Sequence, residues 1–219
     1  MDIIRGVRIV GTGSYLPPRE VRNEILCRYL GKSQEWVERF FGIKSRRFSF
    51  DPESRSMDGN GHDGDLAYEA AIRALEMAGM SPEDLDLIIR ITCRPEYLHF
   101  PDSACVLHKR LQASRDCAAF SLDTGCGGLI YALNLVYGLI RGNGVQRALI
   151  VPSNTSSPFH ERWDPDEPQR QLLEGIIFAD GASALVLDGS ESSENGILCT
   201  YWGAWPQNDP MSYPAGGSR

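Results

Sequence analysis

The chain has 219 residues, of which 42% are hydrophobic and 23% are charged, and its formal net charge is -7. Such a composition suits a globular protein of one full domain or two small ones. The acidic balance argues against nucleic acid or an anionic membrane as the main partner, and no stretch reaches the ~18 apolar residues of a membrane span. We therefore expect no nucleic-acid partner and no membrane anchor.

The cysteines are scattered, without a Cys-x-x-Cys pair, and residues 1–6 do not form a signal peptide. They stand at Cys27, Cys93, Cys105, Cys117, Cys126 and Cys199. This spacing favours reduced thiols in a cytoplasmic protein over a disulfide framework. His108 follows Cys105 by three residues, but two such residues do not make a zinc site, so no metal is expected.

The N-terminal elements begin with a strand over 6–11 and a loop over 11–18. Gly11-x-Gly13 after a strand invites a dinucleotide-binding interpretation, but the third glycine is missing and Pro17-Pro18 prevent a helix from opening there. A short helix over 23–29 and a second helix from Ser33 to about 42 follow. Residues 44–47 are basic, and form either a solvated loop or a phosphate contact. Residues 51–64 have no periodicity and predict a loop.

The middle and end of the chain alternate between helices and apolar strands. Helices are predicted over 65–79, 102–111 and from 129 to about 141, and strands over 85–93, 117–120 and 147–152. After an irregular stretch, 175–178 and 182–187 read as a strand pair with Asp180 as a structural turn residue, and 197–204 as one more strand. Continuous apolar strands alternating with helices predict an α/β fold with a mostly parallel sheet covered on both faces.

Cys126 occupies the most informative position, a glycine-flanked turn between the strand at 117–120 and the following helix. Backbone N–H groups and the positive helix end stabilise a thiolate at such a place. Gly125 and Gly127 keep side chains away from an approaching thioester. The turn alone leaves two possibilities open, a reactive nucleophile and an inert buried thiol.

Seven segments in order along the chain are similar to one known family. They are residues 9–17, 35–47, 67–79 with 86–89, 100–105, the Asp-Thr-Gly-Cys-Gly-Gly motif at 123–128, the Phe-Ala-Asp-Gly-Ala motif at 178–182, and the glycine-rich loop at 214–219. In this register the chain resembles the N-terminal two-thirds of 3-oxoacyl-[acyl carrier protein] synthase III (ketoacyl synthase III) enzymes of the thiolase superfamily.

This resemblance implies a thiolase-like fold of two stacked α/β halves that works as a homodimer. Residues 1–189 would form the N-terminal half, a complete βαβαβ unit with the nucleophile, and 190–219 the first strand and loop of the C-terminal half. The family's catalytic His and Asn lie beyond this length. Because Arg219 ends a glycine-rich loop that a trypsin-like protease would cut, we expect the C-terminal remainder of the polypeptide as a second chain.

The resemblance also assigns site residues. Cys126 would take an acyl group from a coenzyme A or acyl carrier protein thioester, with no resident cofactor, and Gly127 lies beside it. Trp36 resembles the residue that stacks on the adenine of coenzyme A, or is a core tryptophan. Phe100 resembles the residue that reaches into the partner's acyl pocket, or is a core phenylalanine. Arg170 lies two residues from the position of the family's second adenine contact.

Three functions stay open at this stage. The first is decarboxylative Claisen condensation with a malonyl-type acceptor, in a specialised or secondary-metabolism member, because Gly125 and Gly127 depart from the family's usual Ala-Cys-Ala/Ser-Gly. The second is acyl transfer to an alcohol or amine without carbon–carbon bond formation. The third is a non-catalytic partner subunit.

Overall fold

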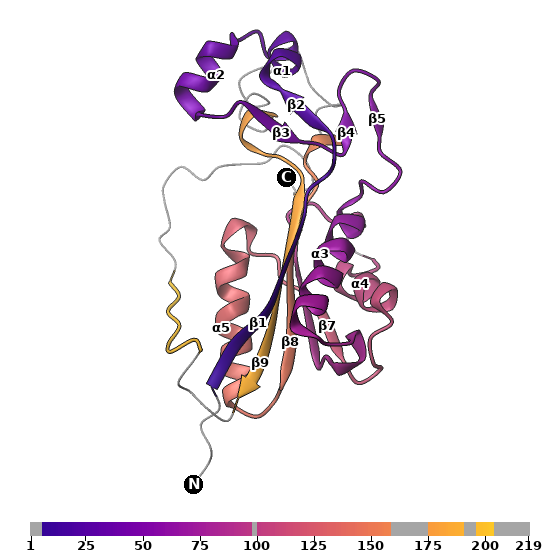
Figure 1. Ribbon diagram of the computed structural model, residues 1–219, viewed down its shortest axis with the longest axis vertical. Helices are drawn as coiled ribbons and strands as arrows, with labels where there is room; N and C mark the ends of the chain where they lie inside the picture. Colours follow the sequence, from indigo (N-terminus) through magenta and orange to yellow (C-terminus); the bar gives the residue numbers. More distant parts are fainter. Residues whose placement is uncertain (1–5, 98–99, 159–174, 191–195, 204–219) are drawn as a thin grey trace.

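The computed structural model describes residues 6–97, 100–158, 175–190 and 196–203, and its main body is a five-stranded sheet (Figure 1). In spatial order the strands are β1 (Gly6–Tyr15), β9 (Gly181–Ser190), β8 (Arg147–Asn154), β6 (Leu87–Ile91) and β7 (Ala118–Ser121). β8, β6 and β7 are mutually parallel, whereas β9 runs antiparallel to both β1 and β8. Four of the five strands therefore run in one direction, as the prediction of a mostly parallel sheet requires, and β9 alone runs against them.

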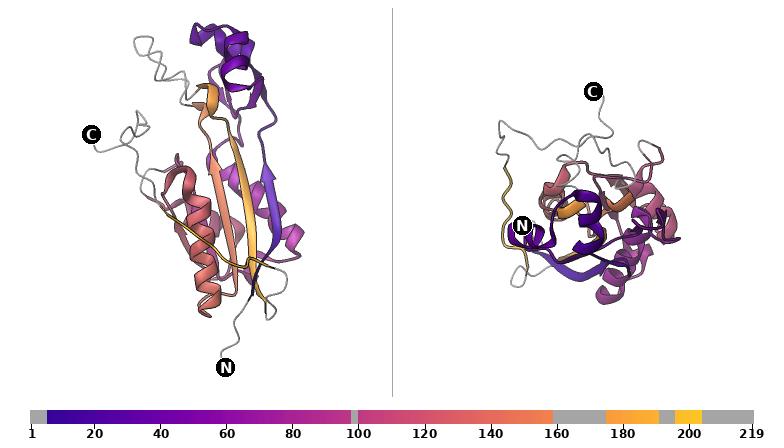
Figure 2. Two further views of the ribbon diagram at one scale, coloured as in Figure 1. Left: turned by 90° about the vertical axis from the view of Figure 1, so that its left-hand side faces the viewer. Right: turned by 90° about the horizontal axis from the view of Figure 1, so that it is seen from above.

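Helices cover both faces of this sheet, which confirms the α/β prediction. α3 (Asp63–Ala78) and α4 (Ser103–Leu111) pack on one face, and α5 (Gly128–Arg141) packs on the other (Figure 2). A short 3-10 turn, η1 (Pro82–Asp84), links α3 to β6, and the Ser81 side chain caps it. Each face has its own apolar cluster, so the sheet is the shared wall of two cores.

Strand β1 is longer than predicted, because Gly11 and Gly13 belong to the strand and not to a loop. A Cβ on Gly11 would lie 2.1 Å from the Ala74 carbonyl oxygen, and one on Gly13 2.1 Å from the Ala70 carbonyl oxygen. The two glycines thus let β1 lie directly against the backbone of α3. A register shift between Ile9 and Gly11 accompanies this contact.

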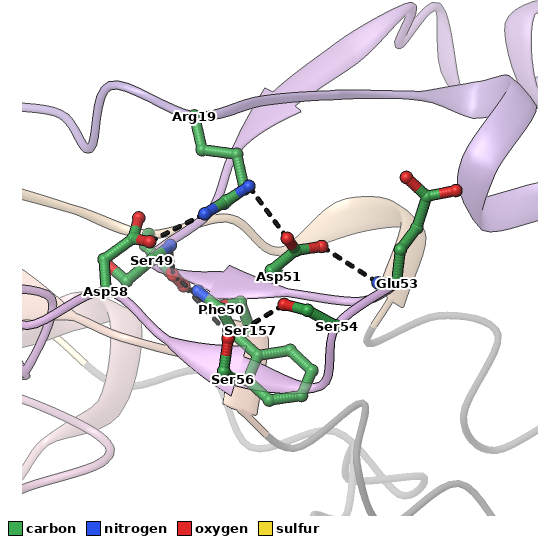
Figure 3. Close-up of polar contacts among 10 residues, drawn as sticks. Arg19, Ser49, Phe50, Asp51, Glu53, Ser54, Ser56, Asp58 and Ser157 are labelled. Atoms are coloured by element: carbon green, nitrogen blue, oxygen red, sulfur yellow. Dashed lines mark hydrogen bonds and ion pairs between the residues drawn. The ribbon is translucent and has the colours of Figure 1, made fainter.

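A small subdomain stands at the carboxyl end of β1 (Figure 1). Its elements are β2 (Glu20–Arg22), α1 (Asn23–Leu30), α2 (Gln34–Phe41), β3 (Ser45–Arg47), β4 (Phe50–Asp51) and β5 (Ser56–Met57). The hairpin of β4 and β5 lies inside the predicted loop 51–64. Arg19 forms ion pairs with Asp51 in this hairpin and with Asp58 just after it (Figure 3). Its guanidinium nitrogens lie 3.1 Å from Asp51 Oδ2 and 2.7 Å from Asp58 Oδ1. These partners are distant in the sequence, so no local pattern predicts the pairing.

Two predicted strands are wrong. Residues 175–177 are helical, and the chain reaches β9 only at Gly181, which pairs with Asn154 at the end of β8. Residues 196–203 form no strand; the hydroxyls of Tyr131 and Tyr137 on α5 donate to the Gly203 and Leu198 carbonyls at 3.3 and 3.1 Å. The Ile197 N–H donates to the Val7 carbonyl of β1 at 2.8 Å, but this single bond does not make a strand ladder.

Candidate active site

Cys126 lies on a sharp turn between β7 and α5, as the pattern of strand, glycines and helix predicts. The turn is a single 3-10 unit, η2 (Gly125–Gly127). Gly125 has a φ of 58°, a left-handed conformation that favours glycine. A Cβ on Gly128 would lie 2.4 Å from Ile91 Cγ2, so the start of α5 presses directly on β6. Glycine is therefore required on both sides of the cysteine for different reasons.

The surroundings of Cys126 suit a thiol that meets a substrate. Cys126 is exposed in the part of the chain that the structure describes. No side chain caps the start of α5. The N–H groups of a helix's first turn have no partner within the helix and carry its positive end. They can therefore stabilise negative charge on the sulfur or on an attached oxyanion.

The subdomain and Cys126 lie at the same end of the sheet. β1, β8, β6 and β7 all run in one direction, so their carboxyl ends lie together. The chain enters the subdomain from the end of β1, and it enters the glycine elbow, the turn η2 that holds Cys126, from the end of β7 (Figure 1). In open α/β sheets, ligands bind outside the carboxyl ends of the strands. This end of the molecule is the candidate site.

Trp36 is on α2 at this end and is half-buried. The Ser33 side chain caps the helix by accepting from the Trp36 N–H at 3.1 Å. The indole packs 5.0 Å from the Phe40 ring and 5.6 Å from the Phe41 ring, and Lys32 Nζ lies 5.3 Å from its centroid. Trp36 is thus part of the subdomain core and also presents a partly open aromatic edge.

Of the other predicted site residues, Gly127 shares the turn of Cys126, Phe100 lies on the loop before α4, and Arg170 is outside the described residues. Phe100 is 90% exposed, next to the cis Phe100–Pro101 bond, so it is not a core phenylalanine. Gly127 directly precedes α5, and a Cβ there would lie 3.4 Å from the Tyr131 ring. Arg170 and the loop at 214–219 are outside the described ranges.

Arg46 fits neither of the two interpretations of the basic segment at 44–47. Its side chain is buried and donates to the Ile176 carbonyl at 3.0 Å and to Asn23 Oδ1 at 2.9 Å. Burial lowers the pKa of Arg46 to about 10. Arg47 donates to the Pro18 carbonyl at 2.7 Å. Both arginines therefore hold the subdomain together, and Arg46 is neither in a solvated loop nor free for a phosphate.

Asp180 has the structural role predicted for it. The carboxylate is buried and accepts from the N–H groups of Ser49 at 2.7 Å, Ser156 at 2.7 Å and Ser157 at 2.9 Å. The Ser157 hydroxyl donates to it as well. Burial raises the pKa of Asp180, and these donors oppose the shift. Asp180 thereby joins the start of β9 to the subdomain and to the segment after β8.

Sequence reasoning missed a buried ion pair at the same end of the sheet. Arg90 on β6 donates from one guanidinium nitrogen to Asp63 Oδ2 at 2.6 Å and to Ser153 Oγ at 2.6 Å. The side chains of Arg90 and Asp63 are only 1% and 3% exposed. An arginine inside the apolar run Leu-Ile-Ile-Arg-Ile is the signal that could have found the pair, because a buried charge requires a partner.

Cys93, just beyond β6, is the second feature that was missed. Its thiol is exposed, although partial removal from water raises its pKa, as do the neighbouring charges of Cys126 and Asp123, while Arg94 opposes them. Its position after a strand adjacent to β7 could have drawn attention to it. Across the described ranges there is no group of three His, Cys, Asp or Glu that could hold a metal, and no helix long and apolar enough to cross a membrane.

Solved structures share this architecture. The 3-oxoacyl-[acyl-carrier-protein] synthase III from Aquifex aeolicus VF5 superposes with a TM-score of 0.70 at 31% identity, over 85% of this chain and 55% of that one. The priming β-ketosynthase from the R1128 polyketide biosynthetic pathway superposes with a TM-score of 0.72 at 28% identity, over 86% of this chain and 51% of that one. The chain thus has the mixed α/β, thiolase-like fold of condensing enzymes.

Sequence comparison gives the family. The family model of 3-oxoacyl-[acyl-carrier-protein (ACP)] synthase III matches residues 120–206, the segment that contains the elbow. The β-ketoacyl-[acyl-carrier-protein] synthase III of Alkalilimnicola ehrlichii is 39% identical over 194 residues, which are 89% of this chain and 54% of that protein. The chain belongs to the ketoacyl synthase III family and spans about half the length of the curated relatives that it matches.

Proposed function

We propose that the native protein transfers an acyl group from a coenzyme A or acyl carrier protein thioester to Cys126 and condenses it with a malonyl-type acceptor. The observation that carries this proposal is the exposed thiol of Cys126 on a glycine elbow at the uncapped start of α5. Relatives that match most of this chain are β-ketoacyl-[acyl-carrier-protein] synthase III enzymes, which supports the reaction class.

The first step needs only groups that this elbow offers. The Cys126 thiolate attacks the thioester carbonyl, the tetrahedral oxyanion accepts from the Cys126 N–H, and the donor leaves as a thiol. Preorganised N–H donors at such a position typically contribute 10²–10³ in rate, about 2.7–4 kcal/mol. In the second step the malonyl group loses carbon dioxide, and its carbanion attacks the acyl thioester and releases Cys126. The family's His and Asn for that step would come from the remainder of the polypeptide.

Support for a specialised or secondary-metabolism member comes from the site itself. Gly125 and Gly127 flank the cysteine where the family usually has larger residues, and Trp36 and Arg170 would contribute to binding of the donor. The R1128 priming ketosynthase, which belongs to a polyketide pathway, is among the structures with this fold. The free cysteines suit a reducing compartment such as the cytoplasm.

We infer that the site is completed by further protein. In the part of the chain that the structure describes, β7 has a neighbouring strand on one side only, and Phe100 is 90% exposed. Both features favour a homodimer in which Phe100 reaches the partner's acyl pocket. α5 is apolar on most of its surface and leaves Ile130 52% exposed. A helix that is apolar all round is normally buried, which favours the C-terminal remainder as its cover.

Mass spectrometry of the full-length protein incubated with acyl-coenzyme A or acylated carrier protein tests the proposal. We expect one acyl group on Cys126, none on C126A, and normal acylation of C105A, which removes another exposed thiol. Release of labelled carbon dioxide from a malonyl donor then identifies condensation. Acylation without carbon dioxide would instead favour acyl transfer to an alcohol or amine. An unacylated wild-type protein would favour a non-catalytic partner subunit.

A further inference from the structure

We propose that Cys93 is a resolving thiol for Cys126, so that peroxide converts the two cysteines into a reversible disulfide that closes the acyl-accepting site. The consequence for acyl transfer depends on the proposed function, whereas formation of the disulfide does not. The Cys126 sulfur, which would otherwise accept the acyl group, would thus also react with a hydroperoxide.

The topology brings the two cysteines to neighbouring strand ends. β6 and β7 are parallel, with Arg90 opposite Ser121, and their pairing continues one step further because the Leu122 N–H donates to the Arg90 carbonyl at 2.8 Å. Cys93 follows that point on β6 by three residues, and Cys126 follows Leu122 by four. Neither segment has moved far from its strand before the cysteine is reached.

The elbow then folds back over β6. Gly128 lies so close to Ile91 that a Cβ would be 2.4 Å from its Cγ2. Ile91 belongs to the apolar cluster on the α5 face of the sheet. Cys93 follows Ile91 by only two residues, so its backbone leaves β6 next to the position that the start of α5 contacts. Cys93 is therefore beside the turn that holds Cys126.

Electrostatics agree with this placement. A charge on Cys126 raises the pKa of Cys93, in addition to the larger effect of partial desolvation. The raised pKa keeps Cys93 in its thiol form near neutral pH. Peroxide reacts with exposed thiols, and Cys126 is exposed at the uncapped start of α5, so Cys126 is the sulfur that would be oxidised first.

The other thiols are placed differently. Cys105 is on α4, which packs on the opposite face of the sheet from α5, and it contacts the Ala119 carbonyl. Cys117 is buried, and burial raises its pKa to about 11. Cys199 lies next to Leu198, whose carbonyl accepts from Tyr137 in the C-terminal half of α5. Cys27 is on α1 in the subdomain, so Cys93 is the cysteine that follows the strand contacted by the start of α5.

The chemistry balances with hydrogen peroxide as the oxidant. The Cys126 thiolate attacks one peroxide oxygen, the O–O bond breaks, and the products are a sulfenic acid and hydroxide. The Cys93 sulfur, as its proton leaves, then attacks the Cys126 sulfur and displaces the sulfenic oxygen as water. Two electrons have passed from two thiols to one peroxide. A dithiol reductant reverses the process by exchange, whereas sulfinic acid, the product of further oxidation, is not recovered in this way.

Peptide mapping of the full-length protein tests the proposal directly. After treatment with hydrogen peroxide and alkylation, trypsin gives the peptides 91–109, because Arg94 precedes a proline, and 116–141. Each peptide also holds one other cysteine, Cys105 or Cys117, so the linked pair is fragmented to locate the bridge. We expect a Cys93–Cys126 link in the wild type and in the control variant C105A.

In C93S we expect loss of the link and accumulation of Cys126 sulfinic acid that dithiothreitol does not reduce. Wild-type Cys126 should return almost completely to the free thiol. A wild-type map without the Cys93–Cys126 link, with Cys126 over-oxidised as readily as in C93S, would overturn the proposal. Since the map requires no acyl substrate, a link found in a protein that cannot be acylated would disprove the proposed function alone.

Discussion

Arg90 and Asp63 form a charged contact inside an otherwise apolar interface between α3 and the sheet. Breaking a buried pair leaves one charge without compensation, which costs about 3–5 kcal/mol. We therefore expect D63A to lower the free energy of unfolding by about that amount, measured by urea denaturation. The double variant R90M/D63A should recover much of the loss, because no isolated charge remains at a site that is 1% exposed.

An exposed pair in the same chain provides the matched control. Arg28 and Glu24 lie four residues apart on α1, at 3.6 Å, with their side chains 58% and 66% exposed. Exposed helical pairs of this spacing contribute about 0.3–0.5 kcal/mol. E24A should therefore leave the denaturation midpoint almost unchanged. Equal effects of D63A and E24A would show that the Arg90–Asp63 contact is not a buried pair in solution.

Asp180 should couple stability to pH. Replacing it with asparagine puts an amide N–H₂ where the serine N–H groups now donate, and one lost buried acceptor costs about 1–3 kcal/mol. In the unfolded state Asp180 should lose its proton near the ordinary Asp pKa of ~3.9. In the folded state burial raises the pKa of Asp180, so the proton is kept to higher pH. The contribution of Asp180 to the free energy of unfolding is therefore largest below pH ~3.9 and decreases as the pH rises through the folded-state pKa.

Urea titrations of the wild type and D180N between about pH 4 and 7 measure this coupling. The wild type should be more stable throughout, with an advantage that is largest at the acidic end and shrinks as Asp180 ionises. An advantage that instead grew with pH would mean that the donors to the carboxylate, from Ser49, Ser156 and Ser157, outweigh its burial and lower its pKa.

Among the secondary-structure elements, the contact between β1 and α3 depends on glycine. A Cβ on Gly13 would lie 2.1 Å from the Ala70 carbonyl and 2.6 Å from the Ala74 N–H nitrogen, both rigid backbone. G13A should therefore destabilise the protein by at least the ~1–3 kcal/mol of an overpacked core. Gly138, inside α5, has no atom near its Cβ position, so G138A should stabilise by about 0.5–1 kcal/mol. Thermal melts that moved in the same direction would contradict this assignment.

The same elements show what the sequence could predict. Helix periods, caps and the elbow at Cys126 are local patterns, and they correctly gave α2 with its Ser33 cap, α3 ending at Gly79, and the turn into α5. Misassigned segments depend on distant partners. Gly11 and Gly13 were predicted as a loop because the reason for glycine there is the close contact with α3, which the local sequence does not show. Residues 175–178 were predicted as a strand, but β9, the strand that joins the sheet, starts after them.

The site follows the same division. Cys126 was found because its glycines and helix are adjacent in the chain, whereas Cys93 and the Arg90–Asp63 pair depend on which strands become neighbours. The order β8-β6-β7 is fixed by crossovers through α4 and α5, not by any local signal. Phe100 was left open between core and surface, and only the fold shows its exposed side chain.

At the scale of the whole molecule, we propose the homodimer at the edge of β7 that has no neighbouring strand among the described residues. The Ala118 and Leu122 N–H groups donate to Asp86 and Arg90 at 2.9 and 2.8 Å. Alternation along a parallel strand then directs the N–H groups of Ala119 and Ser121 to the open edge. Such an edge is a template for another strand, and a second copy of the same chain would cover it by symmetry.

Proline substitutions at two adjacent positions of β7 distinguish its outer edge, where the dimer is proposed, from the edge that pairs with β6. A119P removes an outward N–H and leaves the bonds to β6 intact, since proline is tolerated on an edge strand. Each protomer would lose one bond of about 1 kcal/mol, so the dimer should weaken by roughly 2 kcal/mol, about 30-fold in dissociation constant. A118P instead removes the bond to Asp86 and should lower the stability of the fold. Light scattering across a dilution series measures the first effect and urea denaturation the second, and a dimer unaffected by A119P would place the subunit contact elsewhere.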